Sequence, residues 1–251
     1  MSGRVALISD VHGNLTALRA VLDDIRARGI ERIFNLGDFV GKGPRGQHVA
    51  DLCREVCAVN VRGNWEDFLP AEDPNYSSPE LWWWRGELRP DQLPWLRNLP
   101  LSHDVVMSGR RIRLFHASAH DVHSKVFADH SSAQFDGMFV ATELTGEGPT
   151  PTMVGYGDIH DAYLEVRAGR SLFNVGSVGN PLDECDASYV ILEGEVDSNE
   201  PGPFGLQFVR VPYDIEAEIQ VAADLGMPGL SYWATELRTG VYRTLQPGWL
   251  S

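Results

Sequence analysis

Carboxylate, imidazole and amide side chains recur in this chain at places where they could share a divalent cation. Three of these places directly follow short apolar runs: Asp10-Val-His12 after 5–8, Gly37-Asp38 after 32–36, and Gly63-Asn64 after 58–61. Each run is typical of a strand, and α/β sheets build their sites at the carboxyl ends of strands. If strand geometry continues through Asp10-Val-His12, alternation points both side chains the same way.

Two later motifs supply further ligands of the same kinds. They are Phe115-His116 and Gly157-Asp158-Ile-His160. Mixed carboxylate, imidazole and amide-oxygen ligation suits Mn²⁺, Fe²⁺ or Zn²⁺ better than Ca²⁺. The residue types therefore predict a transition-metal site.

The elements that must position these residues begin with a β-turn-α pattern. Apolar residues at helical spacing predict a helix over 15–25 that stops at Gly29, and a second helix is expected over 47–56. Ser78-Pro79 is a typical helix start, and a last helix is expected over 214–225. Strands are expected at 104–106, 112–115, 152–154, 171–174, 189–192 and 208–211, with 194–205 as a long hairpin loop.

Taken in order, the motifs resemble those of the calcineurin-like metallophosphoesterases, in their compact, phosphodiesterase-like prokaryotic branch. The family pattern is D-x-H, G-D, G-N-H-D/E, a lone H, and G-H-x-H. This chain has Asp10-Val-His12, Gly37-Asp38, Gly63-Asn64-Trp65-Glu66, His116 and Gly157-Asp158-Ile-His160, followed by the similar segments Asn174-Val-Gly-Ser-Val-Gly-Asn-Pro181, Ser188-Tyr189 and Val211-Pro-Tyr-Asp214. The resemblance covers nearly the whole chain. It implies an α/β fold of two packed mixed β-sheets flanked by helices (an αββα sandwich), with 1–251 as one domain.

The resemblance also implies a two-metal site and assigns its ligands. It gives one metal Asp10, His12 and His160, gives the other Asn64, His116 and Asp158, and places Asp38 between them as a bridge. Two such cations generate hydroxide from a bridging water at neutral pH and clamp the phosphoryl oxygens. Manganese is the favoured metal, with iron, zinc, nickel and magnesium as alternatives.

Two positions depart from the family pattern. Trp65 stands where the family has a histidine that assists the leaving oxygen, and an indole N–H cannot supply a proton at neutral pH. Substrates with good leaving groups should therefore be favoured. Asp158 replaces the first histidine of G-H-x-H. Its carboxylate oxygen is a harder ligand than an imidazole nitrogen, so the second site should favour Mn²⁺ or Mg²⁺, or bind metal more weakly.

Other residues near the motifs have two interpretations each. Arg62 could make a bidentate phosphate contact or be a solvated charge at a strand end. His120, His123 and His130 are better explained as solvated loop residues than as a replacement acid. The run Trp82-Trp83-Trp84 could stack on a substrate ring, but packing is favoured, and at helical spacing the three cannot share one face.

Composition narrows the class of partner. The formal net charge is −14, with 21 Lys and Arg against 35 Asp and Glu, so no large nucleic acid is expected. Cys53, Cys57 and Cys185 suggest no disulfide framework, and no apolar run approaches the roughly 20 residues of a membrane span. We expect a cytoplasmic protein with a small phosphorylated substrate, and leave a homo-oligomer open.

The sequence thus predicts a metal-dependent phosphoesterase acting on phosphodiesters or nucleotide-like small molecules, with Asp38, Asn64, Arg62 and Trp65 at the reacting phosphate. One alternative is a degenerate module that binds metal and nucleotide with little turnover, because both departures surround the second metal. Another is a phosphomonoesterase or protein phosphatase, which the acidic composition slightly disfavours.

Overall fold

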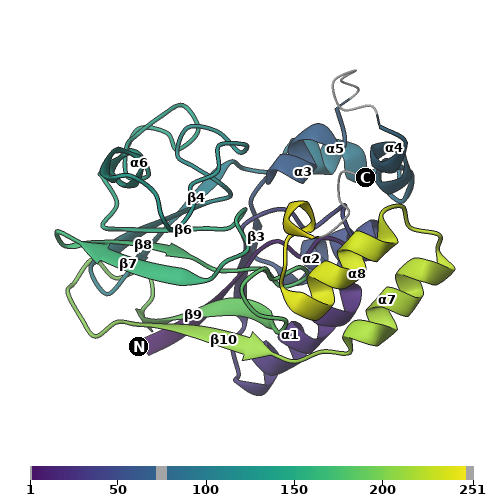
Figure 1. The fold of residues 1–251 in the computed structure, drawn as a ribbon. Coiled ribbons are helices and arrows are strands. Elements are labelled where there is room, and N and C mark those ends of the chain that lie inside the picture. The colour runs from purple at the N-terminus through teal and green to yellow at the C-terminus, as the bar shows by residue number, and fades with distance from the viewer. Residues whose placement is uncertain (1, 72–77, 247–251) are drawn as a thin grey trace.

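The structure, a computed structural model, describes residues 2–71 and 78–246. It contains two mixed five-stranded sheets packed face to face, with helices on their outer faces (Figure 1). The predicted α/β sandwich of two sheets flanked by helices is confirmed.

The first sheet carries the amino-terminal half of the site. Its order is β10-β9-β1-β2-β3. The parallel part consists of β1 (Ser2–Ile8), β2 (Arg32–Asn35) and β3 (Val59–Asn60), while β9 (Ala187–Glu195) and β10 (Gly205–Val211) run antiparallel to their neighbours. The carboxyl ends of β1, β2 and β3 therefore meet at one edge.

The second sheet has the order β4-β5-β6-β8-β7. Its strands are β4 (Ser102–Met107), β5 (Arg110–Phe115), β6 (Met153–Tyr156), β7 (Tyr163–Arg167) and β8 (Arg170–Asn174). Strands β5, β6 and β8 are parallel, and the two hairpin partners β4 and β7 form the edges.

The helices are mostly short. They are α1 (Leu15–Ala27), α2 (Gly46–Val56), α3 (Asn64–Phe68), α4 (Pro79–Gly86), α5 (Gln92–Arg97), α6 (Ser132–Gly137), α7 (Ile215–Asp224) and α8 (Leu230–Thr239), followed by a 3₁₀ turn at Arg243–Leu245. Asn14 and Ser78 cap α1 and α4 by accepting backbone N–H groups, as expected for these residue types.

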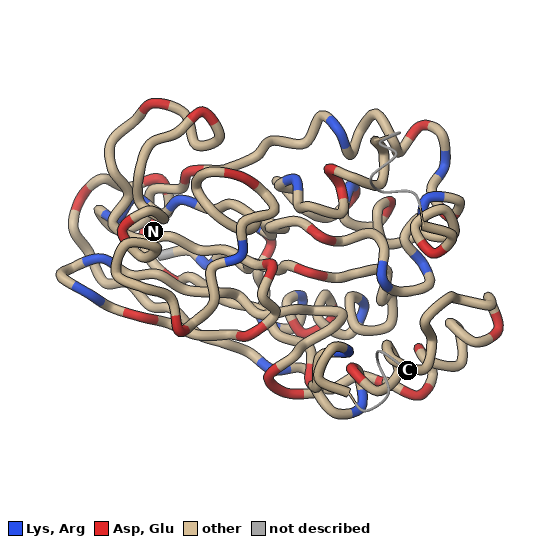
Figure 2. Tube along the Cα trace, turned by 45° about the horizontal axis from the view of Figure 1, so that its top comes forward, with Lys and Arg blue, Asp and Glu red and all other residues tan. Residues whose placement is uncertain are grey.

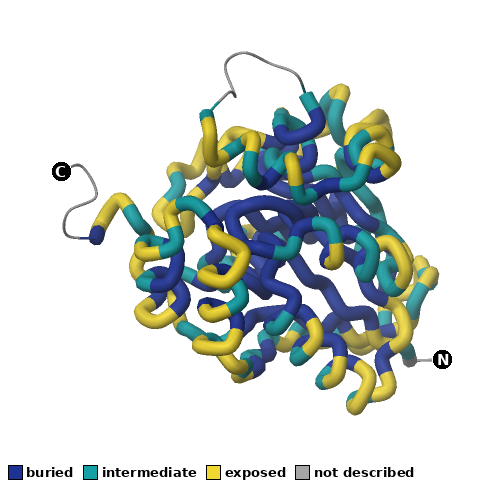
Figure 3. Tube along the Cα trace, turned by 90° about the vertical axis from the view of Figure 1, so that its right-hand side faces the viewer, coloured by how far each residue is buried: buried dark blue, intermediate teal, exposed yellow. Residues whose placement is uncertain are grey.

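The apolar core has three layers. One lies between the first sheet and helices α1 and α2, one between the two sheets, and one between the second sheet and α6. In Figure 3 the buried segments run through the middle of the molecule, with exposed segments at the periphery. The sheets are therefore covered on both faces, which explains the continuous apolar run at the end of β1.

The expected strands and helices are all present within a few residues of their predicted bounds, and 196–204 links β9 to β10. Strand β7 and helices α3, α5, α6 and α8 were not predicted. In β7 the apolar side chains Leu164 and Val166 face solvent, the reverse of the usual alternation. Helices α3, α5 and α6 have only five or six residues, which gives too few turns for a periodic signal.

Candidate metal centre

The seven predicted ligand residues lie in loops that follow strands of both sheets. Asp10 and His12 follow β1, Asp38 follows β2, Asn64 begins α3 after β3, His116 follows β5, and Asp158 and His160 follow β6. All except Asn64 are buried, and Asn64 is half-buried. The structure therefore brings together residues up to 150 positions apart in the sequence.

Their ligand atoms form two overlapping groups. The ligand atoms of Asp10, His12 and His160 lie within 4.8 Å of one another, as do those of Asp10, Asp38 and His116. The Asp38 Oδ2 atom lies 3.3 Å from His116 Nε2 in its own group and 3.8 Å from His12 Nε2 in the other group. Asp38 therefore lies close to a histidine of each group, while Asp10 is the residue that both groups share.

Several buried polar atoms in this cluster have no hydrogen-bond partner. Besides His12 Nδ1, they are Asp10 Oδ1, Asn64 Oδ1, His116 Nε2 and Asp158 Oδ2. A buried polar atom without a partner costs about 1–3 kcal/mol. All four atoms are metal-ligand atoms by type, so the donor set fits divalent cations. The Asp158 carboxylate is included, although it replaces a histidine.

Two of the three imidazoles, those of His116 and His160, are oriented by a hydrogen bond of their second nitrogen. His116 Nδ1 lies 2.9 Å from the Leu36 carbonyl oxygen, and His160 Nδ1 contacts the Asn180 carbonyl oxygen. Donation of the Nδ1 proton to these carbonyls turns Nε2 towards the carboxylates, as metal-binding histidines require.

The electrostatics of the cluster also favour a cation. Burial lowers the pKa of His12 well below its usual range, which keeps the imidazole neutral and able to ligate. Burial also acts to lower the pKa of His116, but the carboxylates of Asp38, Asp10 and Asp158 outweigh it and raise the pKa to about 10. Without metal, the negative charge of the three carboxylates therefore keeps His116 protonated. A bound cation would balance that negative charge instead.

The ligand loops adopt backbone conformations that are uncommon for residues with side chains. Positive φ angles occur at Asp10 (54°), His12 (47°), Asp38 (53°), Asp158 (65°) and His160 (67°). Such left-handed residues cost roughly 1 kcal/mol or more each and concentrate at functional sites. Strand β1 ends at Ile8, so these turns, rather than strand alternation, aim Asp10 and His12. The condition that strand geometry continues through Asp10-Val-His12 is therefore not met.

Glu66 fixes the loop that carries Asp38. Its Oε2 accepts the backbone N–H groups of Asp38 (2.7 Å) and Gly63 (2.9 Å), and its Oε1 accepts those of Phe39 (3.0 Å) and Val40 (3.2 Å). The sequence placed Glu66 in the Gly63-Asn64-Trp65-Glu66 motif but indicated no role for it. Its actual role could have been suspected from its place in the first turn of a helix, where a carboxylate can reach backwards to backbone donors.

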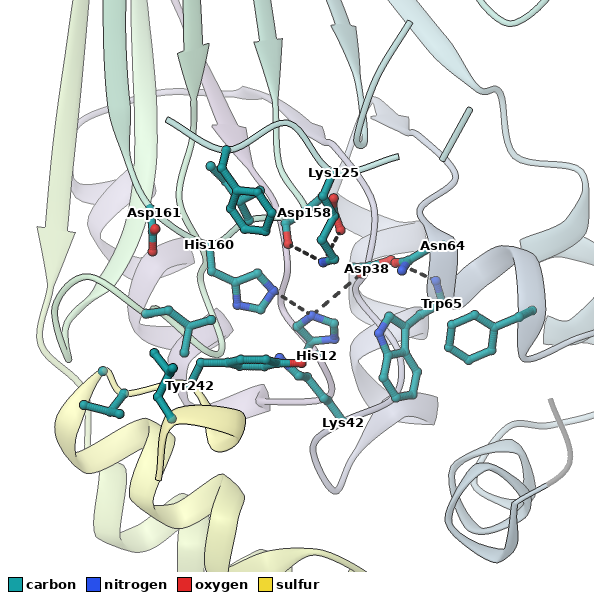
Figure 4. Close-up of a pocket in the computed structure, with 17 residues that line it drawn as sticks. His12, Asp38, Lys42, Asn64, Trp65, Lys125, Asp158, His160, Asp161 and Tyr242 are labelled. Carbon is teal, nitrogen blue, oxygen red and sulfur yellow. Dashed lines mark hydrogen bonds and ion pairs between the residues drawn. The ribbon is translucent and has the colours of Figure 1, made fainter. Parts of the chain in front are cut away.

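Trp65 and Lys125 border the cluster from different sides. The Trp65 ring meets the His12 ring edge-on at 5.7 Å between centroids, and its backbone N–H donates to Asp38 Oδ1 at 2.9 Å. Lys125 Nζ lies 2.9 Å from Asp158 Oδ1 (Figure 4). Lys125 was missed by the sequence interpretation, because nothing in its local sequence ties it to Asp158.

A pocket of about 610 Å³ opens over the cluster. Its floor includes His12, Asp38, Asn64, Asp158 and His160, and its walls include two lysines and four aromatic residues, namely Lys42, Lys125, Trp65, Phe68, Phe127 and Tyr242. A pocket of this size suits a small organic ligand.

The remaining candidates do not line this pocket. Arg62 donates to the Arg97 carbonyl oxygen at 2.8 Å and lies 3.7 Å from Asp67, which favours its role as a strand-end charge. His123 pairs with the same Asp67 at 3.0 Å, and His130 pairs with Glu165 at 2.9 Å. The three tryptophans face different ways: Trp84 is buried, and Trp82 is 55% exposed.

A family model described as the calcineurin-like phosphoesterase superfamily domain matches residues 4–197. The chain belongs to this superfamily. The match spans β1 to the end of β9 and includes all seven ligand residues, so the resemblance drawn from the motifs is confirmed at the level of the family.

Individual proteins show the same relationship. An uncharacterized protein of Methanocaldococcus jannaschii is 31% identical over 224 residues, covering 84% of this chain and 88% of that protein. The crystal structure of a metallophosphoesterase from Sphaerobacter thermophilus has a TM-score of 0.73 and 25% identity, with 95% of this chain and 99% of that chain covered. A hypothetical protein from Pyrococcus horikoshii has a TM-score of 0.69 and 18% identity, with 96% and 98% covered, and shares the fold.

Proposed function

We propose that this protein hydrolyses phosphoesters with two divalent cations held by its seven clustered ligand residues. The observation that carries the proposal is the pair of ligand groups that share Asp10, with four buried ligand atoms left unpartnered. When bound, such cations lower the pKa of water and balance the charge that develops on the phosphoryl oxygens. Manganese is our first choice of metal, because Asp158 adds a hard oxygen ligand.

The chain's own residues would orient the phosphate and balance its charge. Asp38 lies close to a histidine of each ligand group, and Lys125 adds a positive charge beside Asp158. Trp65 lines the pocket and cannot release a proton at neutral pH. We therefore propose substrates whose leaving group departs without protonation.

The pocket supports phosphodiesters or nucleotide-like small molecules as substrates. Its volume of about 610 Å³ exceeds what a phosphate alone would fill, and aromatic residues in its wall can pack against a ring. Acidic residues outnumber basic ones and are distributed over most of the trace in Figure 2. That distribution argues against a large nucleic acid as the partner.

We also propose that the protein works in the cytoplasm. The three cysteines are free, as in a reducing compartment. Separately, none of the helices in the described ranges has the length and apolar character to span a membrane. Cell fractionation with an antibody to the protein tests the location.

The proposed function is tested with bis(p-nitrophenyl) phosphate and protein loaded with Mn²⁺, Fe²⁺, Zn²⁺, Ni²⁺ or Mg²⁺. We expect metal-dependent release of nitrophenol, and we expect Asp38→Asn to abolish it. Asp197→Asn is the matched control, because Asp197 is exposed in a loop outside the pocket and should leave the rate unchanged. Absence of turnover with every metal would contradict the proposal.

A second candidate is a module that binds metal and nucleotide without turnover, favoured by Trp65 at the place of the family's histidine. Calorimetry with Mn²⁺ and a nucleotide separates the two candidates. Tight binding of both, without hydrolysis of any phosphodiester, would support the binding module instead.

A further inference from the structure

The chain contains only two lysines, and both line the pocket. Arginine supplies the other 19 of its 21 basic side chains, and the two lysines are Lys42 and Lys125. In Figure 4 they lie on opposite sides of His12, with Lys125 near Asp158 and Lys42 near Tyr242. The two ammonium groups therefore face different parts of the pocket.

The two lysines differ in how their charge is balanced. Lys125 has a direct carboxylate partner in Asp158. Lys42 is buried, and its ammonium donates to the Asn180 side-chain oxygen at 2.6 Å and lies 5.5 Å from the centre of the Tyr242 ring. Within 2–71 and 78–246, no carboxylate forms an ion pair with Lys42.

The carboxylate that most favours the charged form of Lys42, that of Glu236, is already engaged by an arginine. Glu236 accepts two hydrogen bonds from the Arg243 guanidinium, at 2.8 and 2.9 Å, and contacts Lys42 only through Asn180. Burial lowers the pKa of Lys42 to about 8, so the side chain still carries its charge at neutral pH. A buried charge without a counterion is costly unless a ligand supplies one.

The backbone around Lys42 is held in a fixed and strained shape. Lys42 has a φ of 64°, uncommon for a residue with a side chain. A Cβ atom at Gly41 would lie 2.0 Å from the Trp65 ring, and one at Gly43 would lie 2.2 Å from the His12 carbonyl oxygen. The loop is therefore tightly packed against its neighbours, and the position of the Lys42 ammonium is fixed without a ligand.

We propose that Lys42 binds a second phosphate group of the substrate, distinct from the phosphate that is hydrolysed. This rests on the proposed function, which places the reacting phosphate over the ligand cluster. A lysine has three N–H donors, and Asn180 takes one, so two remain for phosphate oxygens. The Lys42 side chain lines the same pocket, and its ammonium is held by Asn180 near the Tyr242 ring, which also lines the pocket.

The shape of the pocket identifies the substrate class. Its aromatic residues Trp65 and Tyr242 can pack against an organic group that joins the two phosphates. A small phosphoester that carries a second phosphate on a ring-containing group, such as a nucleoside bisphosphate ester, matches both features. A simple diester with one phosphate would leave Lys42 without its counterion.

Two matched substrates test this inference. They are thymidine 5′-(p-nitrophenyl phosphate) and the same compound with an added 3′-phosphate. In the metal-loaded wild-type protein we expect kcat/KM to be about tenfold or more higher for the compound with two phosphates, as a charge-assisted hydrogen bond allows. In Lys42→Met and Lys42→Gln we expect the ratio of the two kcat/KM values to fall to about one.

The control and a second measurement separate this inference from the proposed function. Arg26→Met removes an exposed charge on α1, outside the pocket, and should leave the ratio unchanged. Affinities of thymidine 3′,5′-bisphosphate and thymidine 5′-phosphate, measured by calorimetry, give the same comparison without turnover. Preferential binding of the bisphosphate without hydrolysis of either ester would refute the proposed function and retain the Lys42 site.

Three outcomes would overturn the inference. One is equal kcat/KM for the two esters in the wild-type protein. Another is equal affinity for the two nucleotides. The third is a preference that survives in both Lys42 variants while circular dichroism shows them folded.

Discussion

At the scale of single residues, Trp65 is held by close packing on several sides. Its ring lies directly on the backbone of Gly41, and its centroid is 4.9 Å from that of Phe68 and 5.4 Å from that of Trp84. A histidine would leave part of this space empty. The packing indicates that Trp65 shapes the pocket, rather than marking the loss of an acid.

We therefore expect Trp65→His to lower the unfolding free energy by about 2 kcal/mol, because large-to-small substitutions leave a cavity. We expect kcat/KM on bis(p-nitrophenyl) phosphate to fall as well. Urea unfolding and steady-state kinetics measure both changes, with Trp82→His at a 55% exposed position as the control. A gain in turnover with unchanged stability would instead show that the site lacks an acid.

Lys125 offsets the negative charge of Asp158, the carboxylate that stands where the family has a histidine. It is bonded to Asp158 Oδ1, while Asp158 Oδ2 remains without a partner. The ammonium thus offsets the negative charge of Asp158, so that the pair presents about the same charge to a cation as a neutral imidazole.

Lys125→Met should change metal binding and turnover in opposite directions. Removing the ammonium leaves Asp158 more negative, so the weaker of the two Mn²⁺ affinities should increase. The reacting phosphate loses a nearby positive charge, so kcat should fall by about 10-fold to 100-fold. Calorimetry and kinetics test the two effects, and Lys125→Arg, which keeps the charge, should lie closer to wild type. If Mn²⁺ affinity and kcat both fell by similar factors, Lys125→Met would have caused a general structural defect.

At the scale of elements, α3 and the loop after β2 are joined by Glu66. The four N–H groups that its carboxylate accepts come from Gly63 at the start of α3 and from the loop residues Asp38, Phe39 and Val40. A Cβ atom at Gly63 would lie 2.2 Å from Asp38 Oδ1, so the helix and the loop approach at van der Waals distance. The carboxylate therefore fixes the bridging ligand through the backbone.

Glu66→Gln should damage both the fold and the metal centre. Either orientation of the amide would place its NH₂ group against two backbone N–H donors, which should cost about 2–3 kcal/mol of unfolding free energy. Movement of Asp38 should also weaken metal binding. Denaturant unfolding and metal titration measure the two losses, and Glu31→Gln, on the exposed surface, is the control. Unchanged stability and metal affinity would refute this role for Glu66.

At the scale of the whole molecule, the ligand cluster joins the two sheets. Asp10, His12 and Asp38 come from the first sheet, and His116, Asp158 and His160 come from the second. A cation shared between them would bind the folded protein and not the separated strands. Metal binding should therefore raise the free energy of unfolding.

We expect Mn²⁺ at 100 times its dissociation constant to add about 2.7 kcal/mol per site. For a chain of this size, that corresponds to a rise in Tm of roughly 5–10 °C per occupied site. Calorimetry with and without EDTA measures the shift. Asp38→Asn should reduce it, and Asp197→Asn should not. A Tm that is independent of metal in the wild-type protein would contradict a two-metal centre.

The sequence alone determined the strands that carry the site and the order of its ligand motifs. A continuous apolar run identifies β1, and the apolar pair Ile33 and Phe34 marks β2. Each strand is followed within three residues by its predicted ligand residue. Those features are local, since they depend only on residue type and spacing within a few positions.

Only the tertiary structure decided how the ligand side chains are aimed and what borders them. The left-handed turns at Asp10 and His12 are unfavourable by themselves and exist because the surrounding loops enforce them; Asp10 N–H, for example, donates to the Gly37 carbonyl oxygen at 2.9 Å. Lys125 reaches Asp158 across 33 residues, and Lys42 reaches Asn180 across 138. Arg62, adjacent to a motif, is drawn to the Arg97 carbonyl oxygen instead. Contacts between residues so far apart depend on the packing of the two sheets, and no local pattern encodes them.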